Sequence, residues 1–419
     1  MKIAIVGAGV AGVTSAYELA RAGHEVTVFE RRASVAEESS FAPGAVLGVG
    51  LLAPWAMPGA MAAPSVVGTN QRVRTRSASL AELRWLLQWR SAARASLRSP
   101  EPTPPMRALA RLAQFSQQCF LETAETLELV LEGSQGALVL LQDEKSAKPL
   151  RPAVDTLRAA GAALHELDTQ AARQIEPGLA DAEHLTIALH LPEAVAANCR
   201  QFTGSLRQAA QRLGVAFEFQ AEVTRLSPAQ GRMALQLGGD AQARAFDAVV
   251  LCTGAQAARL AEPLGLRLGL VALWGSSLTA PLREDAAAPQ GVVIDVARQV
   301  TLSRLGQRIR VAGGAELGRG DGTPHPATVR QLHDALDAWF PGSAQRAGMQ
   351  LWRGARAMRP GGLPALGLSG VPGLWLNLGH GGCGWSLASG CARLLAEMLS
   401  GQVSAWDASE LAHFSAAKA

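Results

Sequence analysis

Three glycines near the start of the chain have the spacing of a turn that binds phosphate groups. Gly7, Gly9 and Gly12 follow an apolar run at residues 3–6, which predicts a buried strand, and they open a helix-like segment. The first glycine permits a tight turn, the second lets a pyrophosphate approach the backbone, and the third lets the helix pack closely on the strand. The helix N-terminus then offers N–H groups and a partial positive charge to the phosphates. This spacing predicts a dinucleotide site.

An acidic residue stands where a ribose would need it. Glu30 lies 18 residues beyond Gly12, at the end of a second strand predicted over 25–29. A carboxylate at this place accepts hydrogen bonds from ribose hydroxyls, whereas a 2′-phosphate would need an arginine nearby. The acid therefore favours FAD or NAD over NADP.

Later segments distinguish between these two cofactors. Residues 246–255, FDAVVLCTGA, predict a buried strand that ends at Thr253 and Gly254. The elements expected before it are a helix over 201–213, a strand over 215–219, and a hairpin of 223–226 with 233–237. A Rossmann core that returns through such a hairpin and closes with a glycine-rich C-terminal segment is typical of FAD proteins.

With these segments the chain resembles the D-amino-acid oxidase superfamily of FAD-dependent oxidoreductases, and within it the small subunits of bacterial D-amino-acid dehydrogenases. The segments that carry the resemblance are 2–30, 53–59, 246–255, 307–316, 354–367 and 377–385. The resemblance implies an α/β fold in which a Rossmann-type FAD-binding domain is interleaved with a mixed-sheet α+β substrate domain. The FAD-binding domain would take residues 1–55, 196–265 and 355–419, and the substrate-binding domain 56–195 and 266–354.

The resemblance also implies a reaction and a residue to orient the substrate. The α-hydrogen of an amino acid would leave as hydride to flavin N5, and the imine would hydrolyse to a 2-oxo acid and ammonia. Arg356 matches the carboxylate-binding arginine of the family, and a planar guanidinium fork suits that task. His380 is a second catalytic candidate, either as a general base or as a hydrogen-bonded residue at the flavin edge.

The glycine-rich stretch around His380 precedes a helix predicted over 385–399. We expect its glycines to bring backbone N–H groups and a helix N-terminus to the flavin, where negative charge accumulates. Cys383, in the same stretch, is a candidate for covalent flavin attachment, although packing is the simpler interpretation. The full set expected at the cofactor is Gly7, Gly9, Gly12, Glu30, Arg31, Ser39, Ser40, Val223, Thr253, Gly254, Gly379, Gly381, Gly382 and Gly384.

The chain departs from the family where a substrate would lie. Leu51 and Trp274 replace polar family residues, and with Arg356 they form the expected substrate pocket. The chain has a single tyrosine, Tyr17, on the first Rossmann helix. The pocket is therefore expected to be apolar and reshaped. Three functions stay open: a D-amino-acid dehydrogenase, an oxidase or dehydrogenase of a secondary amine (of the sarcosine or glycine oxidase kind), and a catalytically silent FAD-binding subunit.

Composition excludes several other classes. The net charge is +4, and basic residues are scattered without a run or aromatic interleaving, so nucleic acid is not an expected partner. The five cysteines have neither metal-site nor redox spacing, and we expect no metal. The N-terminus passes directly into an apolar strand without a cleavable signal pattern, which favours a cytoplasmic protein.

Two stretches bear on a membrane. Residues 39–71 contain no charged residue, but several prolines and glycines interrupt them, so we expect a buried loop rather than a spanning helix. Residues 80–98 mix leucines and tryptophan with arginines, as a helix at a membrane surface does. The alternative is an ordinary helix that packs one face on the substrate domain. The resemblance implies an amino acid or amine substrate, a quinone or another carrier as electron acceptor, and a peripheral contact with the inner face of a membrane.

Overall fold

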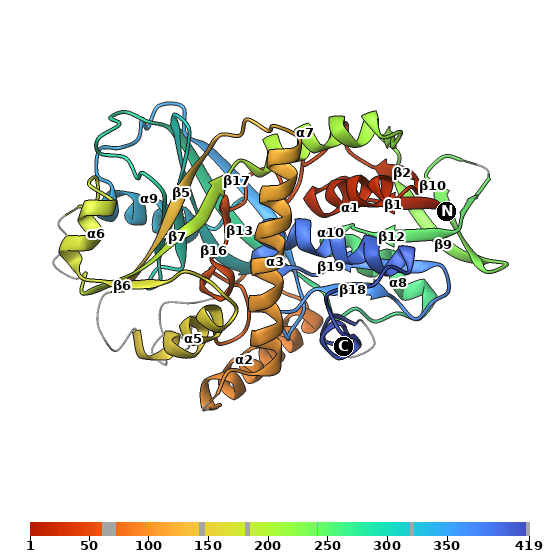
Figure 1. Ribbon diagram of the computed structural model, residues 1–419, viewed down its shortest axis with the longest axis horizontal. Helices are drawn as coiled ribbons and strands as arrows, with labels where there is room; N and C mark the ends of the chain where they lie inside the picture. Colours follow the sequence, from red (N-terminus) through yellow and green to blue (C-terminus); the bar gives the residue numbers. More distant parts are fainter. Residues whose placement is uncertain are drawn as a thin grey trace.

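The computed structural model describes residues 1–60, 73–99, 101–141, 147–180, 185–240, 242–318 and 322–415. Two sheets dominate it, one toward each end of the long axis, with helices between and around them (Figure 1). The predicted class is confirmed: a Rossmann-like α/β part is interleaved along the chain with a mixed sheet.

The glycine turn belongs to a six-stranded sheet of order β18-β19-β12-β1-β2-β8. All neighbouring strands in it pair in parallel except β18 and β19. The strands are β1 (Lys2–Val6), β2 (Glu25–Glu30), β8 (Ala216–Phe219), β12 (Ala248–Leu251), β18 (Ala365–Leu368) and β19 (Leu374–Leu378). A separate three-stranded sheet contains β9 (Val223–Ala229), β10 (Arg232–Leu237) and β11 (Arg244–Phe246), which confirms the predicted hairpin.

The second large sheet is mixed, with the path β17-β13-β16-β15-β14-β5-β7-β3. Two short strands extend it, one beside β16 and one beside β7. Its strands are β3 (Val46–Leu47), β4 (Arg74–Thr75), β5 (Gly133–Leu141), β6 (His165–Leu167), β7 (Ile187–Ala197), β13 (Val271–Pro281), β14 (Val292–Asp295), β15 (Val300–Leu305), β16 (Arg308–Leu317) and β17 (Gln350–Met358).

Helices fill the space between the sheets, where α3 packs along α10 (Figure 1). The α-helices are α1 (Val10–Arg21), α2 (Leu80–Arg98), α3 (Pro104–Thr126), α5 (Arg151–Ala159), α6 (Thr169–Ile175), α7 (Cys199–Arg212), α8 (Ala257–Ala261), α9 (Pro326–Trp339), α10 (Gly384–Ser400) and α11 (Ala408–Leu411). Short 3₁₀ turns are η1 (Gly50–Leu52), η2 (Lys148–Leu150), η3 (Gly254–Gln256), η4 (Glu262–Leu264), η5 (Gly381–Cys383) and η6 (Ala412–Phe414). The three helices that were predicted with residue bounds, 80–98, 201–213 and 385–399, are confirmed within two residues at each end.

Strand β1 is buried on both faces, which explains its continuous apolar run. Ile3 and Ile5 pack in the core that contains α1, α7 and α10. Ala4 and Val6 pack in a different core, against β9, β10 and α8. Because successive strand residues point to opposite faces, a strand covered on both sides needs apolar residues throughout.

The division into two domains stays a prediction. Two strands of the large mixed sheet lie wholly or partly within the ranges that were predicted for the FAD-binding domain. β3 lies within the expected cofactor segment 1–55, and β17 crosses the boundary at 355. Both belong to the large mixed sheet, because β3 pairs with β7 and β17 pairs with β13. The described part of the charge-free stretch, 39–60, is largely buried as expected, and its residues 61–71 lie outside the described ranges.

Close packing at the start of α1 requires a glycine. A Cβ atom built on Gly12 would lie 1.9 Å from the carbonyl oxygen of Gly7. Gly7 itself has φ +102°, and a Cβ there would lie 2.9 Å from the carbonyl oxygen of Cys252. At these two glycines the turn, helix α1 and the end of β12 are therefore in direct backbone contact, with no room for a side chain between them.

We expect Gly12→Ala to lower the free energy of unfolding by at least about 3 kcal/mol, because the new methyl group forces α1 away from the turn. Urea unfolding followed by circular dichroism measures this. Gly204→Ala is the matched control: Gly204 is also helical, in α7, and a Cβ there has nothing within 4 Å. The control should be neutral or stabilising by up to about 1 kcal/mol. Equal midpoints for the Gly12 variant and the wild type would contradict the prediction.

Candidate functional site

A cavity of about 670 Å³ lies where the two sheets face each other. Its walls come from the β1–α1 turn, the segment 36–46, strands β13 and β17, and the loop that leads into α10. The volume is within the range of about 300–1,000 Å³ usual for ligand and cofactor sites. Every residue expected at the cofactor lines the cavity except Gly12, which packs against the Gly7 carbonyl beneath the turn.

The N-terminus of α1 faces this cavity without a side-chain cap. Its N-cap is Gly9, which has an extended backbone. The Val10 N–H donates to Ser40 Oγ at 3.0 Å, and the Gly7 N–H donates to the Phe29 carbonyl at 2.8 Å. An exposed helix N-terminus of this kind attracts phosphate oxygens.

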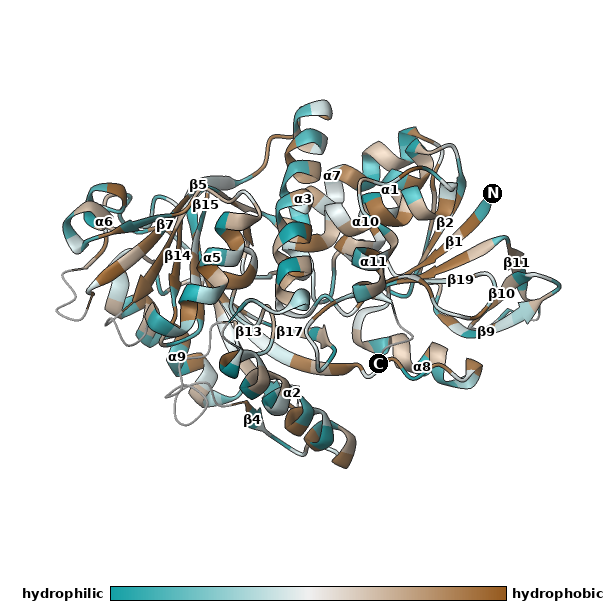
Figure 2. Cartoon of the chain, turned by 60° about the horizontal axis from the view of Figure 1, so that its bottom comes forward, coloured by the Kyte–Doolittle hydropathy of each residue, from teal (hydrophilic) through white to brown (hydrophobic). Residues whose placement is uncertain are grey.

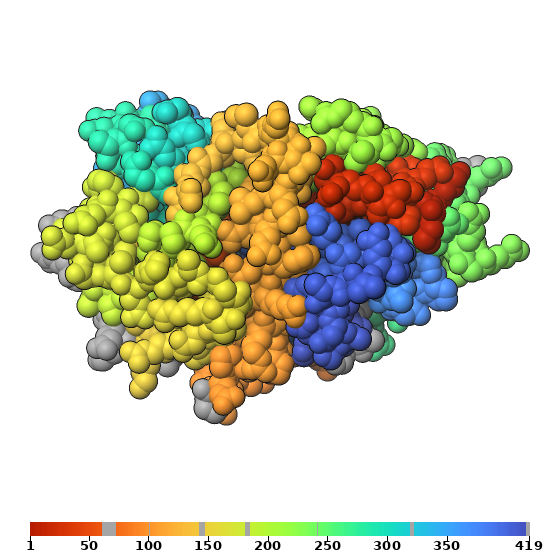
Figure 3. Space-filling model, in the orientation of Figure 1, coloured from red at the N-terminus to blue at the C-terminus, as the bar shows by residue number. Residues whose placement is uncertain are grey.

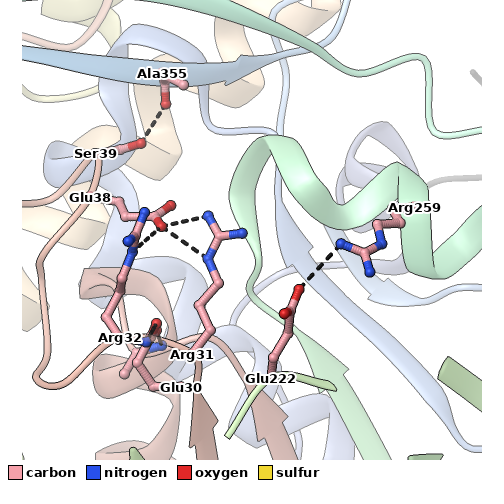
Figure 4. Close-up of polar contacts among 9 residues, drawn as sticks. Glu30, Arg31, Arg32, Glu38, Ser39, Glu222, Arg259 and Ala355 are labelled. Atoms are coloured by element: carbon pink, nitrogen blue, oxygen red, sulfur yellow. Dashed lines mark hydrogen bonds and ion pairs between the residues drawn. The ribbon is translucent and has the colours of Figure 1, made fainter. Parts of the chain in front are cut away.

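Glu30 is the last residue of β2 and is followed by Arg31 and Arg32 (Figure 4). Its Oε2 accepts the Ala8 N–H at 2.7 Å, and its Oε1 accepts the Arg32 N–H at 2.8 Å. Two backbone donors thus fix the carboxylate, and its remaining lone pairs stay available to ligand hydroxyls. This geometry suits the predicted ribose contact.

The charged side chains at this end of the cavity form pairs with one another. Arg31 and Arg32 both donate to Glu38, and Arg259 donates to Glu222 (Figure 4). The guanidinium of Arg31 is therefore engaged within the protein, although the residue lies at the cavity as expected.

Other residues expected at the cofactor also line the cavity. Val223 and Gly254 form part of the wall, and Ser39 donates its hydroxyl to the Ala355 carbonyl. Thr253 Oγ1 is buried, and within the described part of the chain it has no hydrogen-bond partner. A buried hydroxyl at a cavity wall is satisfied when a ligand supplies the missing partner.

The glycine-rich loop before α10 was expected to donate its backbone N–H groups to the flavin, but two of these groups are used within the protein. The Gly382 N–H donates to the Trp55 carbonyl at 3.2 Å, and the Cys383 N–H donates to the His380 carbonyl. A Cβ on Gly382 would lie 2.5 Å from the Pro54 carbonyl oxygen. Gly382 thus permits close packing of the 53–60 segment, and the donors left for a ligand begin at the uncapped N-terminus of α10.

His380 is buried and neutral. Its Nε2 lies 2.8 Å from Asn377 Oδ1, and the Asn377 amide donates to Ser15 Oγ at 2.9 Å. Burial lowers the pKa of His380 to about 4. The imidazole is a weak base at neutral pH, so this arrangement favours an orienting role over general base catalysis. Burial also raises the pKa of the Cys383 thiol to about 12, which disfavours covalent attachment there.

Arg356 is half-buried on β17 and lines the cavity. Its Nη1 donates to the Gly314 carbonyl at 2.6 Å. A Cβ on Gly275, in the adjacent strand, would lie 2.3 Å from Nη2, so the absent side chain makes room for the guanidinium. Burial lowers the pKa of Arg356 to about 10, against the attraction of Glu316. The group is still a cation at pH 7, and no carboxylate in the described ranges forms an ion pair with it.

The two other expected pocket residues have different positions. Trp274 lines the cavity, with the Arg353 guanidinium 4.2 Å from the centre of its ring. Leu51 does not line the cavity: it is fully buried in η1, which packs on α3 and α5. The expectation for Leu51 is corrected because the chain turns inward after β3, a change of direction that local sequence does not reveal.

Sequence reasoning missed several polar groups of the cavity wall. Among the described residues they are buried without hydrogen-bond partners, and they are Ser276 Oγ, Trp352 Nε1, Arg353 Nε, Trp385 Nε1 and Ser386 Oγ. Their positions beside Trp274, Arg356 and the glycine-rich loop were the available signal. Together with two helix N-termini, they form a wall rich in donors that suits a phosphate-bearing, acceptor-rich cofactor.

The buried His380 should make stability depend on pH. Its pKa is about 4 in the folded protein and about 6.5 when unfolded, so the unfolded state binds more protons between these values. The contribution of His380 to the free energy of unfolding is fully present above pH 6.5. It is lost as the pH decreases toward 4, and the free energy of unfolding falls by about 2 kcal/mol between pH 7 and pH 5. Urea unfolding at both pH values measures this. In His380→Gln the free energy of unfolding should no longer show this loss between pH 7 and pH 5. The same pH dependence in the variant as in the wild type would contradict the lowered pKa of His380.

Comparison with known proteins identifies the family. The family model described as FAD dependent oxidoreductase matches residues 2–398. The D-amino acid dehydrogenase of Cereibacter sphaeroides is 36% identical over 98% of this chain and 94% of its own length. Glycine oxidase from Geobacillus kaustophilus has the same fold, with a TM-score of 0.71 at 23% identity, covering 99% of this chain and 97% of that one. L-alpha-glycerophosphate oxidase from Mycoplasma pneumoniae, solved with FAD bound, has a TM-score of 0.72 at 15% identity, covering 97% and 95%.

The donor-rich cavity and these matches lead to the same cofactor. The uncapped ends of α1 and α10 and the fixed Glu30 carboxylate suit the phosphates and ribose of FAD. The chain belongs to the family of FAD-dependent oxidoreductases.

Proposed function

We propose that this FAD-dependent oxidoreductase oxidises a D-amino acid to its imino acid, which hydrolyses to a 2-oxo acid and ammonia. The observation that carries the proposal is Arg356, a half-buried cation without an ion-pair partner in the described residues, in the same cavity as the cofactor residues. The similarity to proteins named D-amino acid dehydrogenase supports the class of substrate. FAD, when bound, supplies the acceptor for a hydride.

Arg356 would hold the substrate carboxylate. Its guanidinium is already oriented by the Gly314 carbonyl, and it loses little further freedom when it binds. A carboxylate would also neutralise a charge that is expensive to bury alone. Trp274 and Trp352 line the same region and would contact the substrate side chain.

The substrate amine would lose its proton to solvent rather than to a protein base. His380 has a pKa near 4 and Cys383 a pKa near 12, so neither exchanges protons readily at neutral pH. The acidic residues that line the cavity, Glu30, Glu37, Glu38 and Glu222, come from the part that holds the glycine turn and β9. The rate should therefore rise with pH as the free amine becomes more abundant.

Anaerobic mixing of the FAD-loaded protein with amino acids tests the reaction. Bleaching of the flavin absorbance by D-amino acids, and not by their L forms, is the expected result. Bleaching by glycine or sarcosine instead would favour a secondary or simple amine, and no bleaching by any of these would contradict the proposal. We propose a quinone or another carrier as the acceptor, so reoxidation by a soluble quinone analogue should exceed reoxidation by oxygen.

Loss of the carboxylate contact should be visible in kinetics. We expect Arg356→Leu to raise KM by about 10- to 150-fold, because a charge-assisted hydrogen bond contributes about 1.5–3 kcal/mol. Steady-state assays with the preferred substrate measure this.

Two further variants control that experiment. Gly275→Ala keeps the charge but places a methyl group against the guanidinium, and it should raise KM in the same direction. Arg225→Leu removes an exposed arginine of β9 and should leave KM unchanged. A normal KM in the Arg356 variant would refute its role.

We also propose that α2 makes a peripheral contact with the cytoplasmic face of a membrane. One side of α2 packs inward through Trp85, Leu86 and Trp89. Its other side exposes Leu80, Leu83 and Leu87, and the helix lies at the margin of the molecule (Figure 2). The exposed arginines on the same helix are Arg84, Arg90, Arg94 and Arg98. Exposed leucines among arginines suit an anionic lipid surface.

No described helix is both long and apolar enough to span a bilayer.

Vesicle binding tests this contact. We expect the protein to sediment with vesicles that contain phosphatidylglycerol, and Leu83→Ser with Leu87→Ser to weaken binding at least about tenfold through lost apolar burial. The double variant Leu213→Ser with Leu351→Ser, at exposed leucines elsewhere, is the control. Equal sedimentation of the two double variants would contradict the contact.

A further inference from the structure

Three side chains of the large sheet hold three successive carbonyl groups at the cavity wall. Ser277 Oγ donates to the Ala42 carbonyl at 2.8 Å, and Ser303 Oγ donates to the Gly44 carbonyl at 2.9 Å. Between them, Arg310 Nη1 donates to the Pro43 carbonyl at 3.3 Å. The donors come from β13, β15 and β16, so three adjacent strands hold one short segment.

The same segment is fixed on both sides. Before it, Phe41 stacks on Trp352, with ring centres 4.2 Å apart. After it, Ala45 has φ +63°, and its carbonyl accepts the Ala197 N–H at 2.9 Å. A non-glycine residue holds such a left-handed backbone only where its surroundings impose it. The segment is therefore held in one conformation from 41 to 45.

Arg310 is an unusual group for this place. It is 4% exposed, and its Nε donates to Thr279 Oγ1 at 3.0 Å. In the described ranges its guanidinium forms no ion pair, and its acceptors are a hydroxyl and a carbonyl. Burying a cation without a carboxylate costs several kcal/mol, and a hydrophobic residue would avoid that cost. Stability alone therefore does not explain this charge.

The orientation of the carbonyls determines the direction of the N–H groups. The described peptide bonds are all trans, and a trans peptide directs its N–H opposite to its carbonyl. With the Pro43 and Gly44 carbonyls turned to the sheet, the N–H groups of Gly44 and Ala45 point away from it. Gly44 and Ala45 both line the cavity.

We propose that Ser277, Ser303 and Arg310 are positioning residues, which hold the 42–44 carbonyls so that the Gly44 and Ala45 N–H groups donate to the bound cofactor. The positive charge of Arg310 strengthens its bond to the Pro43 carbonyl. The inference concerns FAD binding alone and is independent of the substrate proposed above.

FAD titration of the apoprotein tests this role without any substrate. We expect Ser277→Ala and Ser303→Ala each to raise the Kd for FAD about 3- to 10-fold, and Arg310→Met about 10- to 100-fold. The visible absorption spectrum of the bound flavin should change in each variant, because its hydrogen bonds are altered. Ser134→Ala is the control, since Ser134 Oγ donates to the Arg304 carbonyl on the same sheet and lines no part of the cavity.

Two results would overturn the proposal. One is a Ser277→Ala, Ser303→Ala double variant with the Kd and flavin spectrum of the Ser134 control. The other is a higher Kd for FAD together with an unchanged flavin spectrum and a melting temperature of the apoprotein that is lowered in step with the loss of affinity. That result would indicate a purely structural role. If Arg310→Met fails to fold, the serine variants decide the matter.

Discussion

The parallel pairing of β1 with both β2 and β12 is the constraint on which the cavity depends. It places the carboxyl ends of the three strands side by side, since Val6 is opposite both Phe29 and Leu251. The turn at Gly7, the carboxylate of Glu30 and the hydroxyl of Thr253 therefore meet at one edge. Ligands of open α/β sheets bind at such an edge, and here the uncapped N-terminus of α1 starts there too.

The opposite wall depends on the large sheet and on the segment that joins the two. Residues 39–46 leave the Rossmann unit and end in β3, whose pairing with β7 belongs to the large sheet. This crossing brings Arg356 into the compartment that Gly7 and Glu30 define. The cavity thus combines two helix N-termini, the half-buried Arg356 cation, which has no ion-pair partner among the described residues, and a row of buried donors. Its electrostatic character suits an anionic cofactor and a carboxylate substrate.

The glycines around His380 gain a more specific role from the structure. Gly382 allows the Trp55 carbonyl to approach, and its N–H is used in that contact. The loop therefore joins the segment after η1 to the start of α10, in addition to forming part of the cavity wall. His380, held by Asn377 and kept neutral by burial, orders this junction. In the proposed reaction, proton transfer would be left to the substrate amine and solvent.

Local sequence was sufficient for the Rossmann unit, the hairpin and the three long helices, because their patterns arise within a few residues of chain. The same patterns located Gly7 and Glu30 at the cavity, and the resemblance to the family located Arg356 there. Only the tertiary structure decided that Leu51 is core, that Gly275 makes room for Arg356, and that Arg310 holds the Pro43 carbonyl. These contacts join residues far apart in the chain, and strand register and burial, which neighbouring residues do not specify, determine them.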